Sequence, residues 1–157
     1  MSSLSPNFRE VQSKEIIPFL KWVGGKRWYS ESLKKEFSSF SGRYIEPFLG
    51  GGAIFFSMLP NRALLSDINS DLVHTYQILL SDWQKIVTRL EWHQIKHSSE
   101  HYYVQRSTVP RDDIERAARF IYLNRACWNG LYRVNFKGEF NVPKGSKVKI
   151  LLETDNF

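Results

Sequence analysis

The stretch Ile45-Glu46-Pro47-Phe48-Leu49-Gly50-Gly51-Gly52 decides the fold class of this 157-residue chain. Residues 43–48 predict a strand, and residues 53–59, after the glycines, predict a helix that stops at Pro60. A glycine loop between a strand and a helix lets a ligand approach the backbone closely. A second predicted strand, 63–68, contains Asp67, 21 positions after Glu46. An acidic residue at about this distance binds two ribose hydroxyls in nucleoside sites, so the pattern predicts an α/β nucleoside-binding unit.

Glu46 and Pro47, which precede the glycines, help to distinguish which kind of nucleoside the loop binds. A carboxylate at Glu46 would repel the pyrophosphate of a dinucleotide. S-adenosyl-L-methionine carries no phosphate, and its sulfonium and ammonium groups suit a nearby carboxylate. A purely structural turn with a buried acid is the alternative interpretation.

A second glycine segment, Gly24-Gly25-Lys26, lies upstream. It is no phosphate-binding P-loop, because Leu20 stands where that motif needs its first glycine and Arg27 follows the lysine. Trp22 and Lys26 instead suit a flap, with an indole to cover an adenine or a sulfonium and a cation to hold a carboxylate. A plain structural loop is the alternative.

The remaining pattern divides the chain into a polar tail at 1–14, an α/β part at 15–92 and a lobe at 93–149. Ser30 is expected to cap a short helix with an apolar side, and Asn69 or Ser70 to cap a long one. Residues 93–111 are polar without a clear apolar period, and another helix is expected from Asp112 or Asp113. Segments 133–136 and 139–142 have short strand-like patterns. The apolar positions that support the helices are Leu33, Phe37 and Phe40 in the first; Leu72, Val73, Tyr76, Leu79, Leu80, Trp83, Val87 and Leu90 in the second; and Ile114, Ala117, Ala118 and Ile121 in the third.

Charge is concentrated in the lobe. The chain has a net charge of +6, and residues 125–149 hold six Lys or Arg side chains against Glu139 alone. A basic cluster laced with aromatics is typical of a nucleic-acid-binding face, although a solvated surface is the simpler interpretation of charge alone.

The other titratable residues are expected to be structural. Cys127 is the only cysteine, so we expect a reducing, cytoplasmic setting and a small buried side chain. His93, His97 and His101 recur every four residues, but we expect a polar surface there rather than a metal site. No apolar run approaches the length of a transmembrane helix, so no membrane association is expected.

Taken together, these segments resemble the Dam family of DNA adenine-N6 methyltransferases, from about residue 18 to about residue 149. Residues 19–26 resemble the family's N-terminal cofactor motif, 46–52 its glycine motif and 66–72 its ribose-binding segment. Residues 122–125, 129–131 and 138–143 resemble its target-recognition region. The resemblance implies a partial, Rossmann-like methyltransferase sheet with an inserted, mostly helical and β-hairpin recognition lobe.

The resemblance also assigns roles to individual residues. It implies that Trp22, Lys26 and Asp67 contact S-adenosyl-L-methionine, and that Glu46, Phe48, Gly50 and Gly52 shape its pocket. On the double-stranded DNA side it implies that Lys21 and Arg133 reach guanine edges, that Trp128 and Asn129 engage the duplex while an adenine is flipped, and that Leu131 and Pro143 lie in the contacting region. The family usually has tyrosine at position 128, and a hydrophobic mini-core with a surface charge is the alternative for Trp128 and Arg133. A GATC-like target is implied.

The catalytic motif of the family is missing. Related enzymes hold the N6 amine of adenine with the tetrapeptide Asp-Pro-Pro-Tyr. The 157 residues of this chain contain no Pro-Pro pair, and the late acid Asp155 is followed by Asn156-Phe157. In the family this motif follows the recognition lobe, so residues 150–157 are expected to begin the return to a catalytic domain. An uncovered apolar sheet face is expected as well.

Three interpretations follow from that absence. The chain is a piece of a methyltransferase, half of a split enzyme completed by a second chain, or a non-catalytic DNA-binding protein that occupies methylation sites. The first two are favoured, because selection tends to blunt an exposed sheet edge.

Overall fold

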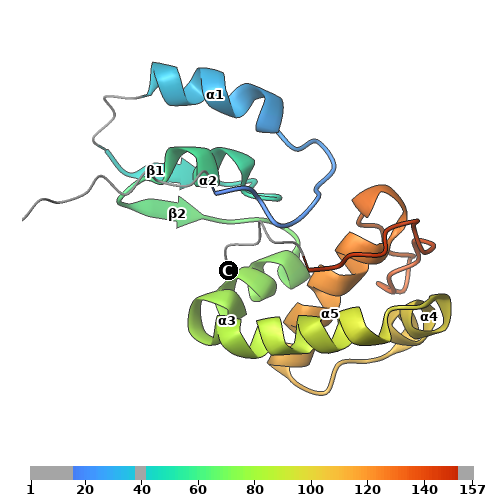
Figure 1. Cartoon of the computed structure of the whole chain (residues 1–157). Helices are drawn as coiled ribbons and strands as arrows, with labels where there is room; N and C mark the ends of the chain where they lie inside the picture. The colour runs from blue at the N-terminus through green and yellow to red at the C-terminus, as the bar shows by residue number, and fades with distance from the viewer. Residues whose placement is uncertain (1–15, 38–41, 152–157) are drawn as a thin grey trace, which may run out of the picture.

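The computed structural model describes residues 16–37 and 42–151, which form an α/β layer beside a helical layer (Figure 1). The first layer consists of helix α1 (Arg27–Glu36), strand β1 (Tyr44–Glu46), helix α2 (Ala53–Met58) and strand β2 (Ala63–Leu65). The second consists of α3 (Ser70–Lys96), α4 (Ser99–Ser107) and α5 (Asp113–Ala126), followed by a 3-10 turn, η1 (Trp128–Gly130). In this part of the chain, no helix has the length and apolar character needed to cross a membrane.

The two strands pair in parallel, as the strand–helix–strand pattern predicts. Ile45 lies opposite Leu64 in the register, and α2 connects β1 to β2. Both strands are shorter than the predicted runs 43–48 and 63–68. Strand β1 ends where the chain beyond Glu46 turns into the glycine loop. The side chains of Ile45 and Leu64 are 58% and 53% exposed, so this small sheet does have an uncovered apolar face.

Helices α3 and α5 lie side by side (Figure 1), and most residues of the buried core come from these two helices. Leu72, Ile86 and Leu90 from α3 are fully buried, as are Ala117 and Ile121 from α5. The small alanine side chains of α5 allow a close approach of the two helices. The predicted stripes are therefore confirmed in part: Leu72 and Leu90 lie in this core, whereas Leu80 and Trp83 are 89% and 42% exposed. Ile86 is buried although the predicted stripe does not include it.

The predicted helix starts are confirmed for α3 and α5. The Asn69 side chain accepts a hydrogen bond from the Leu72 backbone N–H at 2.9 Å. Asp112 accepts one from the Glu115 N–H at 2.7 Å. Each side chain satisfies one of the backbone donors that a helix leaves without an internal partner.

Two local expectations were wrong. Helix α1 begins at Arg27, so Ser30 lies inside it and donates its hydroxyl proton to the Arg27 carbonyl at 2.7 Å instead of capping. Phe40 lies outside the described residues. Helix α4 occupies part of the region expected to lack a regular period, because its buried positions are Tyr102 and Gln105, whose polar atoms hide the helical spacing.

The histidines do not form a polar surface. His93 is fully buried, its Nδ1 lies 3.0 Å from His101 Nε2, and its ring stacks on Tyr122 at a centroid distance of 4.4 Å. His97 Nδ1 lies 2.9 Å from the Tyr122 hydroxyl. The expectation failed because α5 covers this end of α3, which spacing along a single helix does not reveal. Within the described ranges, no cluster of three or more His, Cys, Asp or Glu side chains is arranged to hold a metal ion.

Burial of His93 predicts an acid-sensitive lobe. Burial first, and then the neighbouring His101 and Arg89, lower the pKa of His93 to about 3. The folded-state pKa is below the unfolded value of about 6.5, so the stabilisation is complete above pH ~6.5 and is lost as the pH falls. We expect the free energy of unfolding to decrease by up to about 1.4 kcal/mol per pH unit below that point. Urea titrations monitored by circular dichroism between pH 8 and pH 5 would measure this, and an unchanged midpoint would contradict it.

The end of the lobe is a short hairpin, as the strand-like segments predict. Val134 and Phe140 form an antiparallel bridge, and the Asn135 N–H donates to the Glu139 carbonyl at 2.9 Å.

Cys127, which directly follows α5, is 2% exposed, and burial raises the pKa of its thiol to about 11. It is therefore the small buried side chain that the sequence predicts.

Candidate functional site

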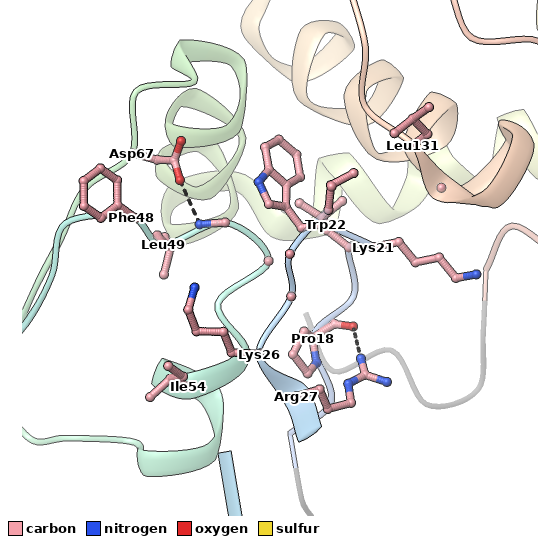
Figure 2. Close-up of a pocket in the computed structure, with 18 of the residues that line it drawn as sticks. Pro18, Lys21, Trp22, Lys26, Arg27, Phe48, Leu49, Ile54, Asp67 and Leu131 are labelled. Atoms are coloured by element: carbon pink, nitrogen blue, oxygen red, sulfur yellow. Dashed lines mark hydrogen bonds between the residues drawn. The ribbon is translucent and has the colours of Figure 1, made fainter. Parts of the chain in front are cut away.

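A cavity of about 770 Å³ lies where the glycine loop, the 18–27 segment and the η1 turn meet (Figure 2). This volume is typical of sites for small molecules. The cavity brings together two groups of residues that the sequence places in separate motifs. Its lining includes the predicted cofactor residues Trp22, Lys26, Glu46, Phe48, Gly50 and Asp67, and the predicted DNA residues Lys21, Trp128, Asn129 and Leu131.

Asp67 connects the glycine loop to the start of α3. Its Oδ2 accepts a hydrogen bond from the Gly50 N–H at 2.8 Å, drawn in Figure 2, and its Oδ1 accepts one from the Asn69 N–H at 2.9 Å. A carboxylate has about four acceptor positions, so each oxygen keeps capacity for a second donor. The sequence predicts Asp67 as a ligand contact, and the structure adds that it holds the loop itself.

Gly50 is required by its conformation and by the packing of Trp22. Its φ is +52°, and a Cβ atom there would lie 2.7 Å from Cδ1 of the Trp22 indole. The glycine loop therefore lies directly against the 20–22 segment. Gly52 lines no part of the cavity; a Cβ there would lie 2.8 Å from the Phe56 ring.

Substituting Gly50 tests this packing. We expect G50A to cost about 1 kcal/mol for the left-handed backbone and about 1–3 kcal/mol more for the overlap with Trp22. The matched control is G138A, because Gly138 has a φ of +78° and a Cβ atom added there would meet nothing within 4 Å. Chemical denaturation of both variants measures the difference, and equal losses would show that the indole moves aside freely.

Glu46 is a half-buried carboxylate at the cavity wall. It accepts a hydrogen bond from the Tyr44 hydroxyl at 2.8 Å. Burial raises its pKa, while the Tyr44 hydrogen bond and the nearby Lys26 ammonium oppose that rise. Figure 2 shows the Lys26 side chain pointing toward the glycine loop and Asp67. On this side of the cavity, the Glu46 and Asp67 carboxylates and the Lys26 ammonium therefore lie within a partly apolar wall.

Tyr76 approaches the same carboxylates from α3. Burial, with the charges of Glu46 and Asp67, raises the pKa of its hydroxyl. This buried oxygen has no hydrogen-bond partner within residues 16–37 and 42–151. A tyrosine in an apolar helical stripe is read from sequence as a core residue, so its polar end beside the glycine loop was not predicted.

Trp22 joins the 18–27 segment to the lobe. Its indole stacks on Tyr132 with ring centroids 5.4 Å apart and an interplanar angle of 24°, and it also contacts Phe120. The indole lines the cavity while this stacking fixes its orientation. The flap that the sequence predicts is thus packed against the lobe.

The lobe contributes exposed side chains to the other wall. Trp128 is 56% exposed, which disfavours the mini-core alternative, and Asn129 has a φ of +54° in the η1 turn. The Trp128 N–H donates to the Pro143 carbonyl at 2.9 Å, which links the turn to the segment after the hairpin. Figure 2 shows Leu131 on the side of the 18–27 segment that faces the lobe.

Arg133 and Pro143 lie outside the cavity lining. Arg133 is exposed on the hairpin, and its Nε donates to Asn141 Oδ1 at 2.8 Å, which orients the guanidinium. Pro143 is also exposed.

Sequence reasoning missed two residues that hold the site together, Asn124 and Asp71. Asn124 is completely buried at the end of α5 and contacts the Lys21 backbone. Asp71 accepts hydrogen bonds from the Arg116 guanidinium at 2.6 Å and from the Tyr132 hydroxyl at 3.2 Å. The sequence does hold one indication of this role: Asn124 directly follows the apolar run 120–123, so its amide is expected to be buried and to need hydrogen-bond partners.

Comparison with known proteins places this architecture in a family. Residues 22–154 match the family described as D12 class N6 adenine-specific DNA methyltransferase. The chain is 40% identical to the type II methyltransferase M1.LlaDCHI of Lactococcus lactis subsp. cremoris, over 88% of this chain and 51% of that protein. It is 40% identical to the type II methyltransferase M.MjaIII of Methanocaldococcus jannaschii, over 83% and 53% respectively.

A DNA adenine methylase of Haemophilus influenzae is 36% identical, over 82% of this chain and 47% of that protein. The chain thus spans about half the length of the curated relatives it matches. The family match covers most of the chain, including the glycine loop, Asp67 and the whole lobe. The chain belongs to the D12 class of N6 adenine-specific DNA methyltransferases.

Proposed function

We propose that this chain binds S-adenosyl-L-methionine and double-stranded DNA as part of an adenine-N6 DNA methyltransferase. The observation that carries the proposal is the shared cavity, in which the glycine loop with Glu46 and Asp67 faces Trp128 and Asn129 of the lobe. A methyl donor and an extruded base have to meet in one place for methyl transfer, and this cavity offers walls for both.

The charges of the cavity suit S-adenosyl-L-methionine. Glu46 and Asp67 supply negative charge for a sulfonium and an ammonium group, and Lys26 supplies positive charge for a carboxylate. Phe48 is 77% exposed at the cavity wall and offers an apolar face to an adenine ring. The bound cofactor would supply the methyl group, while these residues bind and orient it. The parallel pair β1–β2 around the glycine loop supports a Rossmann-like sheet.

The residues on the lobe side suit a DNA duplex. Trp128 and Asn129 project from a turn, where an exposed aromatic ring can insert beside a flipped base. In Figure 2 the Lys21 ammonium extends away from Lys26, toward the lobe side of the loop. We propose that Lys21 and Arg133 contact guanine edges, with Leu131 and Pro143 beside them, in a GATC-like target.

Two binding measurements on the 157-residue chain test the proposal. Isothermal titration calorimetry with S-adenosyl-L-methionine should show one site per chain. Fluorescence anisotropy should show tighter binding of a GATC duplex than of a duplex with the same bases in another order, at one fixed salt concentration. Binding of DNA without any binding of the cofactor would instead favour the non-catalytic DNA-binding protein.

Arg133 provides the test of base recognition. Because an arginine that contacts a guanine edge contributes about 1–3 kcal/mol of discrimination, we expect R133A to reduce the preference for the GATC duplex by about that amount. Lys137 lies in the same exposed hairpin, so K137A is the matched control, with weaker binding to both duplexes and an unchanged preference. An equal loss on both duplexes for R133A would reassign Arg133 to a phosphate contact.

A further inference from the structure

One buried side chain connects the cofactor side and the DNA side of the cavity. Asn124 Oδ1 accepts a hydrogen bond from the Lys21 N–H at 3.0 Å, and Asn124 Nδ2 donates to the Lys21 carbonyl at 2.8 Å. The same Nδ2 donates to the Gly130 carbonyl at 3.2 Å. The carboxamide thus holds both backbone groups of Lys21 and, at the same time, the η1 turn.

These contacts need an uncharged amide. Asn124 is fully buried, so each of its polar atoms requires a partner that water cannot replace. The site presents one donor, the Lys21 N–H, and two acceptors, the carbonyls of Lys21 and Gly130. A carboxylate would match the donor but face both carbonyls with negative charge.

The neighbouring geometry makes the link tight. A Cβ atom on Gly130, whose φ is +65°, would lie 2.6 Å from Cβ of Lys21, so the turn and the loop are in direct contact. On one side of this contact Trp22 lines the cavity beside the glycine loop, and on the other Trp128 and Asn129 project from the turn. A shift of the Lys21–Trp22 backbone therefore has to move or break the contact with the turn.

We propose that Asn124 is a positioning residue that couples the two binding sides, so that a ligand on one side favours binding on the other. This inference rests on the proposed function, because it assigns the cofactor to one side and DNA to the other. The physical basis is that one carboxamide bonds both loops, so the two loops change arrangement together. A ligand that selects this arrangement of one loop also selects it for the other. The coupling is reciprocal, so it has the same size measured in either direction.

The first measurement uses the unmodified 157-residue chain. The dissociation constant for S-adenosyl-L-methionine is measured with and without a saturating GATC duplex, and the constant for the duplex with and without saturating cofactor. We expect each ligand to tighten the other by about fivefold or more, with equal factors in both directions. If both ligands bind but neither changes the dissociation constant of the other, the coupling is overturned and the proposed function remains in place. Binding of neither ligand overturns both.

The second measurement compares N124D with a matched control, Q94E. Gln94 also bridges backbone groups, donating to the Val148 carbonyl and accepting from the Ile150 N–H, but it contacts neither the 20–22 segment nor the η1 turn. Both variants exchange an amide for a carboxylate of the same shape. We expect the coupling factor to fall to about one in N124D and to stay at the unmodified value in Q94E. If N124D does not fold, N124S takes its place, because a hydroxyl retains part of the hydrogen bonding.

A change of pH separates positioning from a general loss of structure. Lowering the pH from about 8 to about 5.5 should protonate a buried carboxyl at position 124 and restore one O–H donor, which serves one of the two facing carbonyls. The coupling factor of N124D should then rise toward that of the unmodified chain measured at the same pH. Full coupling in N124D at high pH, or the same loss of coupling in Q94E, would overturn the role of Asn124.

Discussion

We expect the purified 157-residue chain, incubated with S-adenosyl-L-methionine labelled on its methyl group and a GATC duplex, to transfer no label to DNA above a protein-free blank. The reason is that Asp-Pro-Pro-Tyr does not occur in these residues. The N6 amine of adenine is a poor nucleophile, because its lone pair is delocalised into the ring. Positioning of the reacting groups supplies about 7–11 kcal/mol of catalysis in favourable cases. Without the residues that hold the amine, we expect this contribution to be lost.

The assay needs a preparation that is shown to be folded and free of other methyltransferases. The protein is therefore produced in a host without adenine methylation, and binding of both ligands is verified on the same sample. Label incorporation that grows with the concentration of the chain would contradict the prediction. It would mean that another acceptor within these residues holds the amine.

The substitution D67A should weaken binding of S-adenosyl-L-methionine by about 10- to 100-fold. Asp67 holds the Gly50 N–H and the Asn69 N–H, and in the proposed function it also accepts from the ribose. Removing the carboxylate therefore loosens the glycine loop and removes a ligand contact together. Calorimetric titration of the variant measures the change in affinity, and chemical denaturation measures the accompanying loss of stability.

The matched control is N69A, which disturbs the same corner of the fold. Asn69 caps α3 through the Leu72 N–H, and loss of such a cap costs about 1 kcal/mol. Its side chain does not line the cavity. We expect N69A to lose stability while keeping its cofactor affinity. If N69A and D67A weaken the cofactor equally, Asp67 acts only through the start of α3.

Local patterns were sufficient for the elements of the α/β layer. The apolar run before Glu46, the glycines and the run before Asp67 predicted β1, α2 and β2 in the right order and in parallel. Asn69 and Asp112 marked the starts of α3 and α5 through capping. Patterns failed at α4, where Tyr102 and Gln105 form the buried side, and at His93, whose environment comes from α5.

The sequence alone also placed the candidate residues in motifs, but it did not show which of them meet. Trp22 and Lys26 lined the same cavity as Glu46 and Asp67, as the cofactor motifs predict, and the lobe residues Trp128 and Asn129 joined them. Gly52, by contrast, lines no part of the cavity, and a Cβ atom there would overlap with the Phe56 ring. Residue type and spacing indicate what chemistry a segment can do, whereas packing decides which side of a segment faces the cavity.

By itself, then, the sequence determined the strand–glycine loop–helix–strand unit, because backbone conformation and apolar periodicity there are local properties. Only the tertiary structure decided that a buried amide on α5 holds the Lys21 backbone, a contact between residues 103 positions apart. It likewise decided that the Trp22 indole lies against Tyr132. Such contacts depend on how α3 and α5 pack and so place the lobe beside the glycine loop. The periodicity of a single segment does not predict contacts between distant segments.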